Sequence, residues 1–104
     1  MLVDQRIAQP DPEYQYLTIM DKATRDTDLI VLGRALRILR DRAEITQKQL
    51  AALLEMDATY ISRIERGRRG VQWLTVQRFL RALDADLHQL ADAITEAQES
   101  NAEA

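Results

Sequence analysis

The stretch TQKQLAALLEMDATYISRIERG, residues 46–67, decides the fold because it holds two short apolar-periodic segments joined by the three residues EMD. Thr46 can cap a helix while the Gln49 side chain reaches back to it, an arrangement known as a capping box. Asp57 offers a cap to the second segment, and Gly67 can adopt the left-handed conformation that ends a helix. The linker is too short for a relaxed antiparallel hairpin, so the sequence predicts a sharp helix-turn-helix crossing.

Apolar residues recur at three- and four-residue steps on both sides of this pair, which indicates three further amphipathic helices. The first follows a cap at Thr27 or Asp28. The others cover about residues 72–83 and the segment after Asp86. The apolar positions expected to face the core are Leu29, Leu32, Leu36, Leu39, Ala43, Leu50, Leu53, Leu54, Ile61, Ile64, Trp73, Val76, Phe79, Leu80, Leu83, Leu87, Leu90, Ala91 and Ile94. Because no strand is needed, the predicted fold class is all-α with five helices in the central domain.

The two ends of the chain have weaker patterns. Asp11 before Pro12 is typical of a helix start. The following YQYLTI also alternates like a strand, so residues 12–25 form either a helix, which we prefer, or a strand arm. The tail EAQESNAEA lacks an apolar stripe and is expected to fray. The expected parts are an N-terminal extension at 1–27 that serves dimerisation or a partner, a helical domain at 28–95, and a flexible acidic tail at 96–104.

Charge is unevenly distributed along the 104 residues, although the formal net charge is only −3. Residues 34–81 hold eleven basic and five acidic side chains, a net charge of +6, whereas the remainder carries −9. A basic middle between acidic flanks favours contact with a polyanion such as nucleic acid. The competing interpretation is that the arginines are ordinary solvated charges on surface helices.

Other chemistry is sparsely represented in the sequence. There is no cysteine, no apolar run long enough to span a membrane and no N-terminal leader pattern, so a cytoplasmic chain is expected. His88 is the only histidine, and neither a glycine-rich phosphate loop nor a nucleophile beside a base is present. We therefore expect no enzyme activity, no cofactor and no metal site.

The segment from residue 29 to residue 94 resembles the helix-turn-helix domain of the Cro/C1-type regulators, also called the xenobiotic response element (XRE) family. The matching residues are LG at 32–33, Leu36, Arg40, TQ at 46–47, LA at 50–51, YISRIERG at 60–67, and the later Leu80, Ala82, Leu83, Leu87 and Leu90. Glu55 stands where the family usually has a turn glycine, so either Glu55 adopts a strained conformation or the turn differs slightly. Val71 stands where proline is common. The resemblance implies a five-helix, lambda-repressor-like fold.

The resemblance also implies double-stranded DNA as the partner, with the helix at about 58–66 in the major groove. The family's base-facing positions fall on Ala58, Thr59, Ser62 and Arg63. The positions expected at the DNA backbone are Gln47, Lys48, Tyr60, Arg66, Arg68 and Arg69. These residue types suit the roles, because a small side chain can meet a thymine methyl group and arginine can bind guanine through two hydrogen bonds. Gln47 begins a helix, whose positive end favours phosphate.

Arg40 and Glu65 match family positions where an arginine of the first helix pairs with a glutamate near the end of the third. We expect a buried structural salt bridge there rather than contacts to bases.

One recognition helix reads only a few base pairs, so the simplest function is a homodimeric repressor on an inverted repeat. Apolar residues outside the expected core offer candidate dimer surfaces, namely Ile30, Ile38, Leu74, Tyr14, Tyr16, Leu17 and Ile19. The alternative is a protein-interaction module, or an antitoxin-type adaptor, whose acidic ends bind a partner protein.

Overall fold

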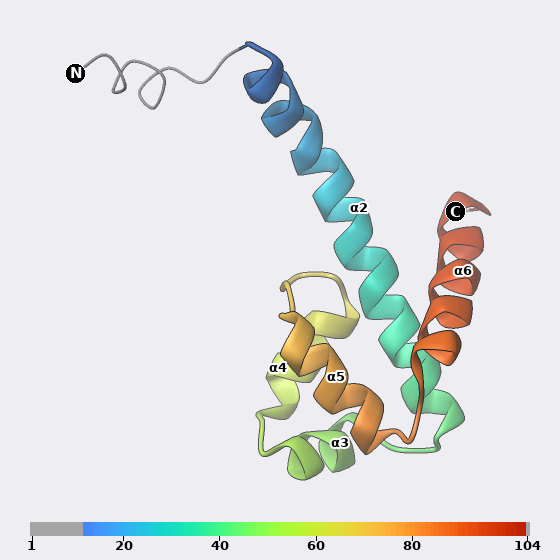
Figure 1. Ribbon diagram of the computed structural model, residues 1–104. Coiled ribbons are helices and arrows are strands. Elements are labelled where there is room, and N and C mark those ends of the chain that lie inside the picture. The colour runs from blue at the N-terminus through green and yellow to red at the C-terminus, as the bar shows by residue number, and fades with distance from the viewer. Residues whose placement is uncertain (1–11, 104) are drawn as a thin grey trace.

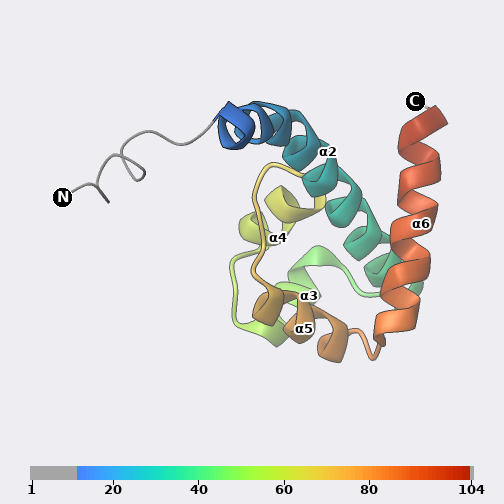
Figure 2. The same ribbon diagram turned by 45° about the horizontal axis from the view of Figure 1, so that its top comes forward.

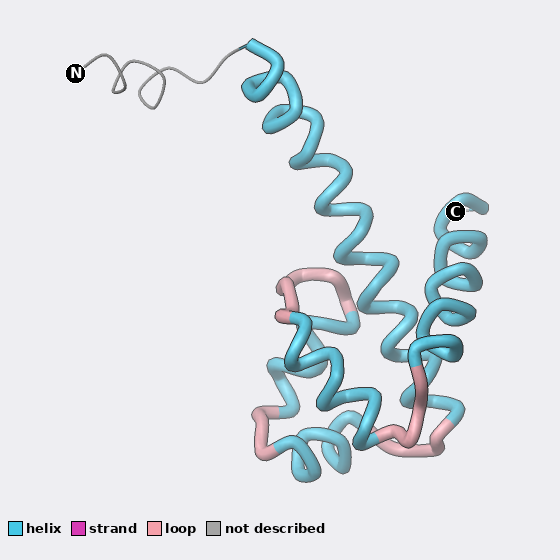
Figure 3. Tube along the Cα trace, viewed as in Figure 1, coloured by secondary structure: helices cyan, strands magenta, loops and turns pink. Residues whose placement is uncertain are grey.

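The computed structural model describes residues 12–103, and every regular element within that range is a helix (Figure 1). The elements are α2 (Pro12–Arg42), α3 (Gln47–Leu54), α4 (Ala58–Glu65), α5 (Trp73–Ala82) and α6 (Leu87–Glu103). Short loops join them, as Figure 3 shows, and the described residues contain no strand. The all-α fold with five helices is therefore confirmed.

The first helix is longer than the sequence indicated. α2 is one continuous helix of 31 residues, so the cap expected at Thr27 or Asp28 is wrong, and residues 12–25 are helical rather than a strand arm. No glycine or proline lies between Pro12 and Gly33 to interrupt the helix, and a potential capping residue acts as a cap only where the preceding backbone leaves the helix. The N-terminal part of α2 projects away from the other helices (Figures 1 and 2). Asp11 lies outside the described residues.

The C-terminal segment continues α6 and buries Ala97, so the expectation that it lacks an apolar stripe is wrong. α6 runs to Glu103 and lies alongside α2 in both views (Figures 1 and 2). Ala93 and Ala97 are fully buried. These small side chains, four residues apart, form a stripe on one face that allows the two helices to approach closely. An apolar stripe made of alanine is difficult to recognise in a sequence because alanine also occurs freely on helix surfaces.

The core joins all five helices around Phe79 and Leu36, which are fully buried. Four apolar positions expected in the core are instead exposed to solvent: Leu53, Trp73, Leu87 and Ala91. Trp73 and Leu87 are the first residues of their helices, where the chain has just left a surface loop. Leu53 and Ala91 each adjoin a buried leucine and therefore point about 100° away from the buried face. The buried apolar residues are Val31, Ala35, Leu36, Leu39, Leu50, Ala51, Leu54, Ile61, Ile64, Val76, Phe79, Leu80, Leu83, Leu90, Ala93 and Ala97.

Two glycines allow α2 to lie directly against the end of α4. A Cβ atom added to Gly33 would lie 2.2 Å from the carbonyl oxygen of Ile64, and one added to Gly67 would lie 2.6 Å from the Cα atom of Ile30. Both distances are well below a van der Waals contact, so larger residues would separate the two helices. Even α2, the longest of the described helices, lacks an apolar stretch suited to crossing a membrane.

Candidate nucleic-acid interface

Local hydrogen bonds start each helix of the α3–α4 pair. The Thr46 hydroxyl accepts from the Gln49 N–H at 3.0 Å, and the Gln49 side-chain oxygen accepts from the Thr46 N–H at 2.9 Å. The Asp57 carboxylate accepts from the Thr59 N–H at 2.8 Å. The predicted capping box and the predicted cap at Asp57 are thus confirmed, and they explain why two helices of only eight residues begin where they do.

The turn between these helices holds Glu55 in the strained conformation that the sequence led us to expect. Glu55 has φ 55° and ψ 46°, in the left-handed region that the family's glycine would adopt without strain. The Met56 N–H donates to the Ala51 carbonyl at 2.9 Å, which closes the turn. Ala51 is buried at the crossing, and Gly67 ends the next segment with φ 71°. The predicted pair of helices joined by the three residues 55–57 is therefore confirmed.

α4 has one buried face and one exposed face. Ile61 and Ile64 are completely buried, whereas Thr59 and Arg63 are exposed and lie one turn apart on the opposite side. The other two expected base-facing residues, Ala58 and Ser62, are half-buried at the edge of this exposed face. The structure thus brings the four residues together along one accessible strip of α4.

Exposed basic side chains lie on the segments next to this strip in the chain. Lys48 is exposed in the first turn of α3, and Arg66, Arg68 and Arg69 are exposed at and beyond the end of α4. The Arg69 guanidinium carbon lies 4.7 Å from the ring centre of Tyr60, a cation–π distance. Tyr60 therefore positions a positive charge beside α4, a role that its place in the sequence did not reveal.

Arg40 and Glu65 form a buried ion pair beneath the exposed strip. The Arg40 Nε donates to Glu65 Oε2 at 2.6 Å and its second terminal nitrogen donates to Glu65 Oε1 at 2.9 Å. The remaining terminal nitrogen donates to the Ile45 carbonyl at 2.8 Å. Hydrogen bonding to Glu65 raises the pKa of Arg40 above its usual value, although burial acts in the opposite direction. The pair connects α2 to the last residue of α4.

The Gln47 side chain also contacts this pair. Its amide nitrogen donates to Glu65 Oε1 at 2.9 Å. One of its two amide hydrogens is thus bound inside the protein, and the second is left for another acceptor. The backbone N–H of Gln47, at the start of α3, has no acceptor within the helix. The same side chain that is expected at a phosphate therefore also fixes the orientation of α3 relative to α4.

The family model described as "Helix-turn-helix domain" matches residues 31–93, which is more than half of the chain. The chain belongs to this helix-turn-helix family. Family membership makes it a DNA-binding transcriptional regulator rather than an enzyme, with α4 in the position of the recognition helix.

Three relatives agree with this assignment. Control protein C.MunI from Mycoplasma sp is 32% identical over 62 residues, which are 59% of this chain and 84% of the relative. The structure of the restriction-modification controller protein C.AhdI from Aeromonas hydrophila matches with a TM-score of 0.57 and 35% identity, over 61% of this chain and 96% of that one. The clp gene regulator ClgR from Corynebacterium glutamicum matches with a TM-score of 0.61 and 33% identity, over 72% and 77% of the two chains.

One contact that supports the helix-turn-helix unit has no signal in the sequence. Arg78 on α5 donates to the backbone carbonyl of Leu54 at 2.6 Å, and Leu54 is the last residue of α3. The last carbonyl groups of a helix have no partner within it, so the arginine satisfies one of them. From the sequence alone, Arg78 is indistinguishable from a solvated surface arginine.

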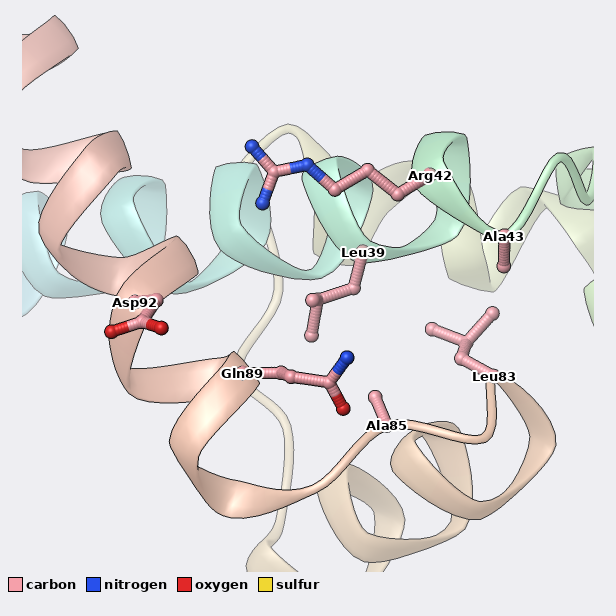
Figure 4. A pocket seen from close by; sticks show the side chains of 7 residues that line it. All are labelled: Leu39, Arg42, Ala43, Leu83, Ala85, Gln89 and Asp92. Atoms are coloured by element: carbon pink, nitrogen blue, oxygen red, sulfur yellow. The ribbon is translucent and has the colours of Figure 1, made fainter.

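A small pocket outside the α3–α4 pair is lined by two charged side chains but by no serine, threonine, cysteine or histidine. It has a volume of about 190 Å³ and lies between the C-terminal end of α2 and the loop that leads into α6 (Figure 4). Its lining residues are Leu39, Arg42, Ala43, Leu83, Ala85, Gln89 and Asp92. Among the side chains that the structure describes, no three of histidine, cysteine, aspartate or glutamate gather as a metal site would require.

Proposed function

We propose that the protein is a homodimeric repressor that inserts α4 into the major groove of an inverted-repeat operator. The observation that carries this proposal is the exposed strip of α4, where Thr59 and Arg63 lie one turn apart, opposite two completely buried isoleucines. Repression is the simplest outcome because it requires only that the operator be occupied. A regulator of this kind acts where the DNA is, so we expect it in the cytoplasm.

The residues of the strip suit the reading of base edges. Ala58 and Thr59 are short enough to bring the helix close to the groove and to contact a thymine methyl group, and Ser62 offers a hydroxyl. Arg63 can donate two hydrogen bonds to the O6 and N7 atoms of guanine. The residues proposed at the DNA backbone are Gln47, Lys48, Tyr60, Arg66, Arg68 and Arg69.

Exposed apolar residues on α5 and α6 support self-association. Leu74 has 69% of its surface exposed, and Trp73 and Leu87 are also exposed. Leu74, Gln77 and Arg81 follow one face of α5 at three- and four-residue steps, and the last two share a pocket of about 430 Å³ with Leu87. We propose this face as the dimer contact because it lies on helices other than the recognition helix and α3.

The other dimer candidates have less exposed surface or lie outside the described side chains. Ile38 is half-buried against the core, and Ile30 is half-buried beside Gly67. The side chains of Tyr14, Tyr16, Leu17 and Ile19 lie outside the described ones. Contacts of the acidic ends with a partner protein remain an alternative hypothesis, for which the projecting part of α2 is the available segment.

Selection from random double-stranded DNA, followed by sedimentation of the protein with and without the selected site, tests the proposal. We expect an inverted repeat whose half-sites lie about one helical turn, roughly 34 Å, apart, and a dimer at micromolar concentration. The selected sites should bind less tightly as the salt concentration rises, because several phosphate contacts release counterions. A selection without a repeated motif, or binding that does not depend on salt, would favour the protein-interaction alternative.

A further inference from the structure

A basic groove lies between α2 and the end of α4, with a volume of about 380 Å³. It is lined by Ile30, Arg34, Arg37, Glu65, Arg66 and Arg68. Four arginines and a single acidic residue therefore line this concave space. Two of them, Arg34 and Arg37, come from α2, which had no expected role in binding DNA.

The one carboxylate does not neutralise the groove. Both oxygens of Glu65 are bound by the buried Arg40, and one also accepts from the Gln47 amide. Its negative charge is thus balanced from behind, outside the groove. The lining arginines retain a positive field that is directed into the open space.

The contacts that the lining arginines make within the protein are weak. Arg34 donates to the neutral side chain of Asn101 at 3.3 Å. Arg37 lies 3.7 Å from Asp41, and both side chains of this pair are mostly exposed. Arg66 donates to the Ser62 carbonyl at a long 3.4 Å. Each guanidinium therefore has donors left for an external acceptor.

The walls of the groove are held rigidly in place. Gly33 and Gly67 let the backbones of α2 and of the α4 end touch, and no side chain separates them. The backbone segments that carry the arginines are thus already close together, so an anion has to order only their side chains. Arginine forks match the oxygen geometry of phosphate, so the ligand class that fits best is a phosphate diester or monoester.

We propose that this groove receives a backbone phosphate of the operator outside the base pairs that α4 reads, with Arg34 and Arg37 as its ligands. The groove adjoins the recognition helix directly, because Glu65 is the last residue of α4 and Arg66 follows it. A duplex in contact with Arg66 and Arg68 therefore brings phosphates to the groove without a separate binding event. This inference rests on the proposed function, and it extends the DNA contact to α2.

The test compares two duplexes and two variants of the full-length protein. One duplex contains the selected inverted repeat with ten flanking base pairs on each side, and the other ends at the repeat. The test variant is Arg34→Gln/Arg37→Gln. The control is Arg25→Gln/Arg42→Gln, which removes the same charge from exposed positions of the same helix.

We expect the test variant to bind the long duplex about tenfold more weakly than wild type, with a salt slope that is shallower by about 0.9 because one phosphate is no longer neutralised. On the short duplex, the affinity and salt slope of the test variant should equal those of wild type. The control variant should bind both duplexes as wild type does. If the double variant is unstable, the single variant Arg37→Gln replaces it, because this position is mostly exposed. The single variant should show about half of the slope change.

Three outcomes would overturn the inference. Equal binding of wild type and test variant to the long duplex would remove the arginines from the DNA contact. An equal loss on both duplexes would place their phosphate inside the repeat. If pyrophosphate binds wild type but not the test variant while DNA binding is unchanged, the groove serves a free phosphate compound. Failure of the wild-type protein to bind either duplex would instead refute the proposed function itself.

Discussion

Two ion pairs on α2 have the same distance but different surroundings. Arg40 Nε lies 2.6 Å from Glu65 of α4, and Arg42 lies 2.6 Å from Glu96 of α6. The first pair has side-chain exposures of 10% and 2%, whereas the second has 58% and 51%. Water screens the exposed pair and can replace either partner, whereas it has little access to the buried pair. The distance between the charged atoms alone therefore does not measure how much an ion pair contributes to the free energy of unfolding.

The same contrast separates the two contacts of α2. Its contact with α4 depends on the hydrogen bonds of Arg40 and Gln47 to Glu65 and on two glycines at close backbone contacts. Each of these residues is needed for the contact as it stands. Its contact with α6 depends on the small buried residues Ala93 and Ala97, with charged groups only at the edge. The first contact specifies where the recognition helix stands, and the second mainly adds buried apolar surface.

Arg40→Met should have the largest effect. It leaves the Glu65 carboxylate buried without its main partner, so we expect the free energy of unfolding to fall by about 3–5 kcal/mol, with weaker DNA binding through a displaced α4. Chemical denaturation and a binding titration measure the two effects. An unchanged melting temperature would show that the pair has little structural importance.

Ala97→Leu tests the contact of α2 with α6. The position is completely buried, so the larger side chain must push the helices apart and should cost about 1–3 kcal/mol. Ala91→Leu makes the same change at an exposed position of α6 and should have almost no effect. If both variants were equally stable, the C-terminal half of α6 would not be packed against α2 in solution.

Arg63→Ala tests whether the recognition of bases is separate from the stability of the fold. Arg63 is exposed, so we expect unchanged stability but a loss of about 1–3 kcal/mol in discrimination at one or two positions of each half-site. Arg68→Ala should instead weaken all sequences equally and reduce the salt slope by about 0.9. Equal weakening by Arg63→Ala on every sequence would assign this residue to phosphate.

Arg42→Met should have the smallest effect, although it changes the residue type in the same way as Arg40→Met. An exposed pair contributes about 0–1 kcal/mol, so thermal unfolding should shift only slightly. This variant is the direct control for Arg40→Met. A loss as large as that of Arg40→Met would contradict the importance that we assign to burial.

The positions that the sequence failed to predict share a physical origin. Leu53, Trp73, Leu87 and Ala91 are apolar enough for a core, but the direction of each side chain depends on which neighbouring helix is present. The contacts of the C-terminal segment depend in the same way on α2, more than 50 residues earlier in the chain. The roles of Arg78 and Tyr60 became visible only when their partners were in place.

The sequence by itself determined the helix pair and its orientation, because the causes are local. The caps at Thr46 and Asp57, the three-residue linker and Gly67 act within one or two turns of the backbone, where spacing along the chain equals proximity in space. Only the tertiary structure decided the continuous α2, the packing of α6 and the gathering of Arg34 and Arg37 with the end of α4. Those features depend on which surfaces from distant parts of the sequence meet. Side-chain packing between helices decides which surfaces meet, and the residue pattern within a single helix does not.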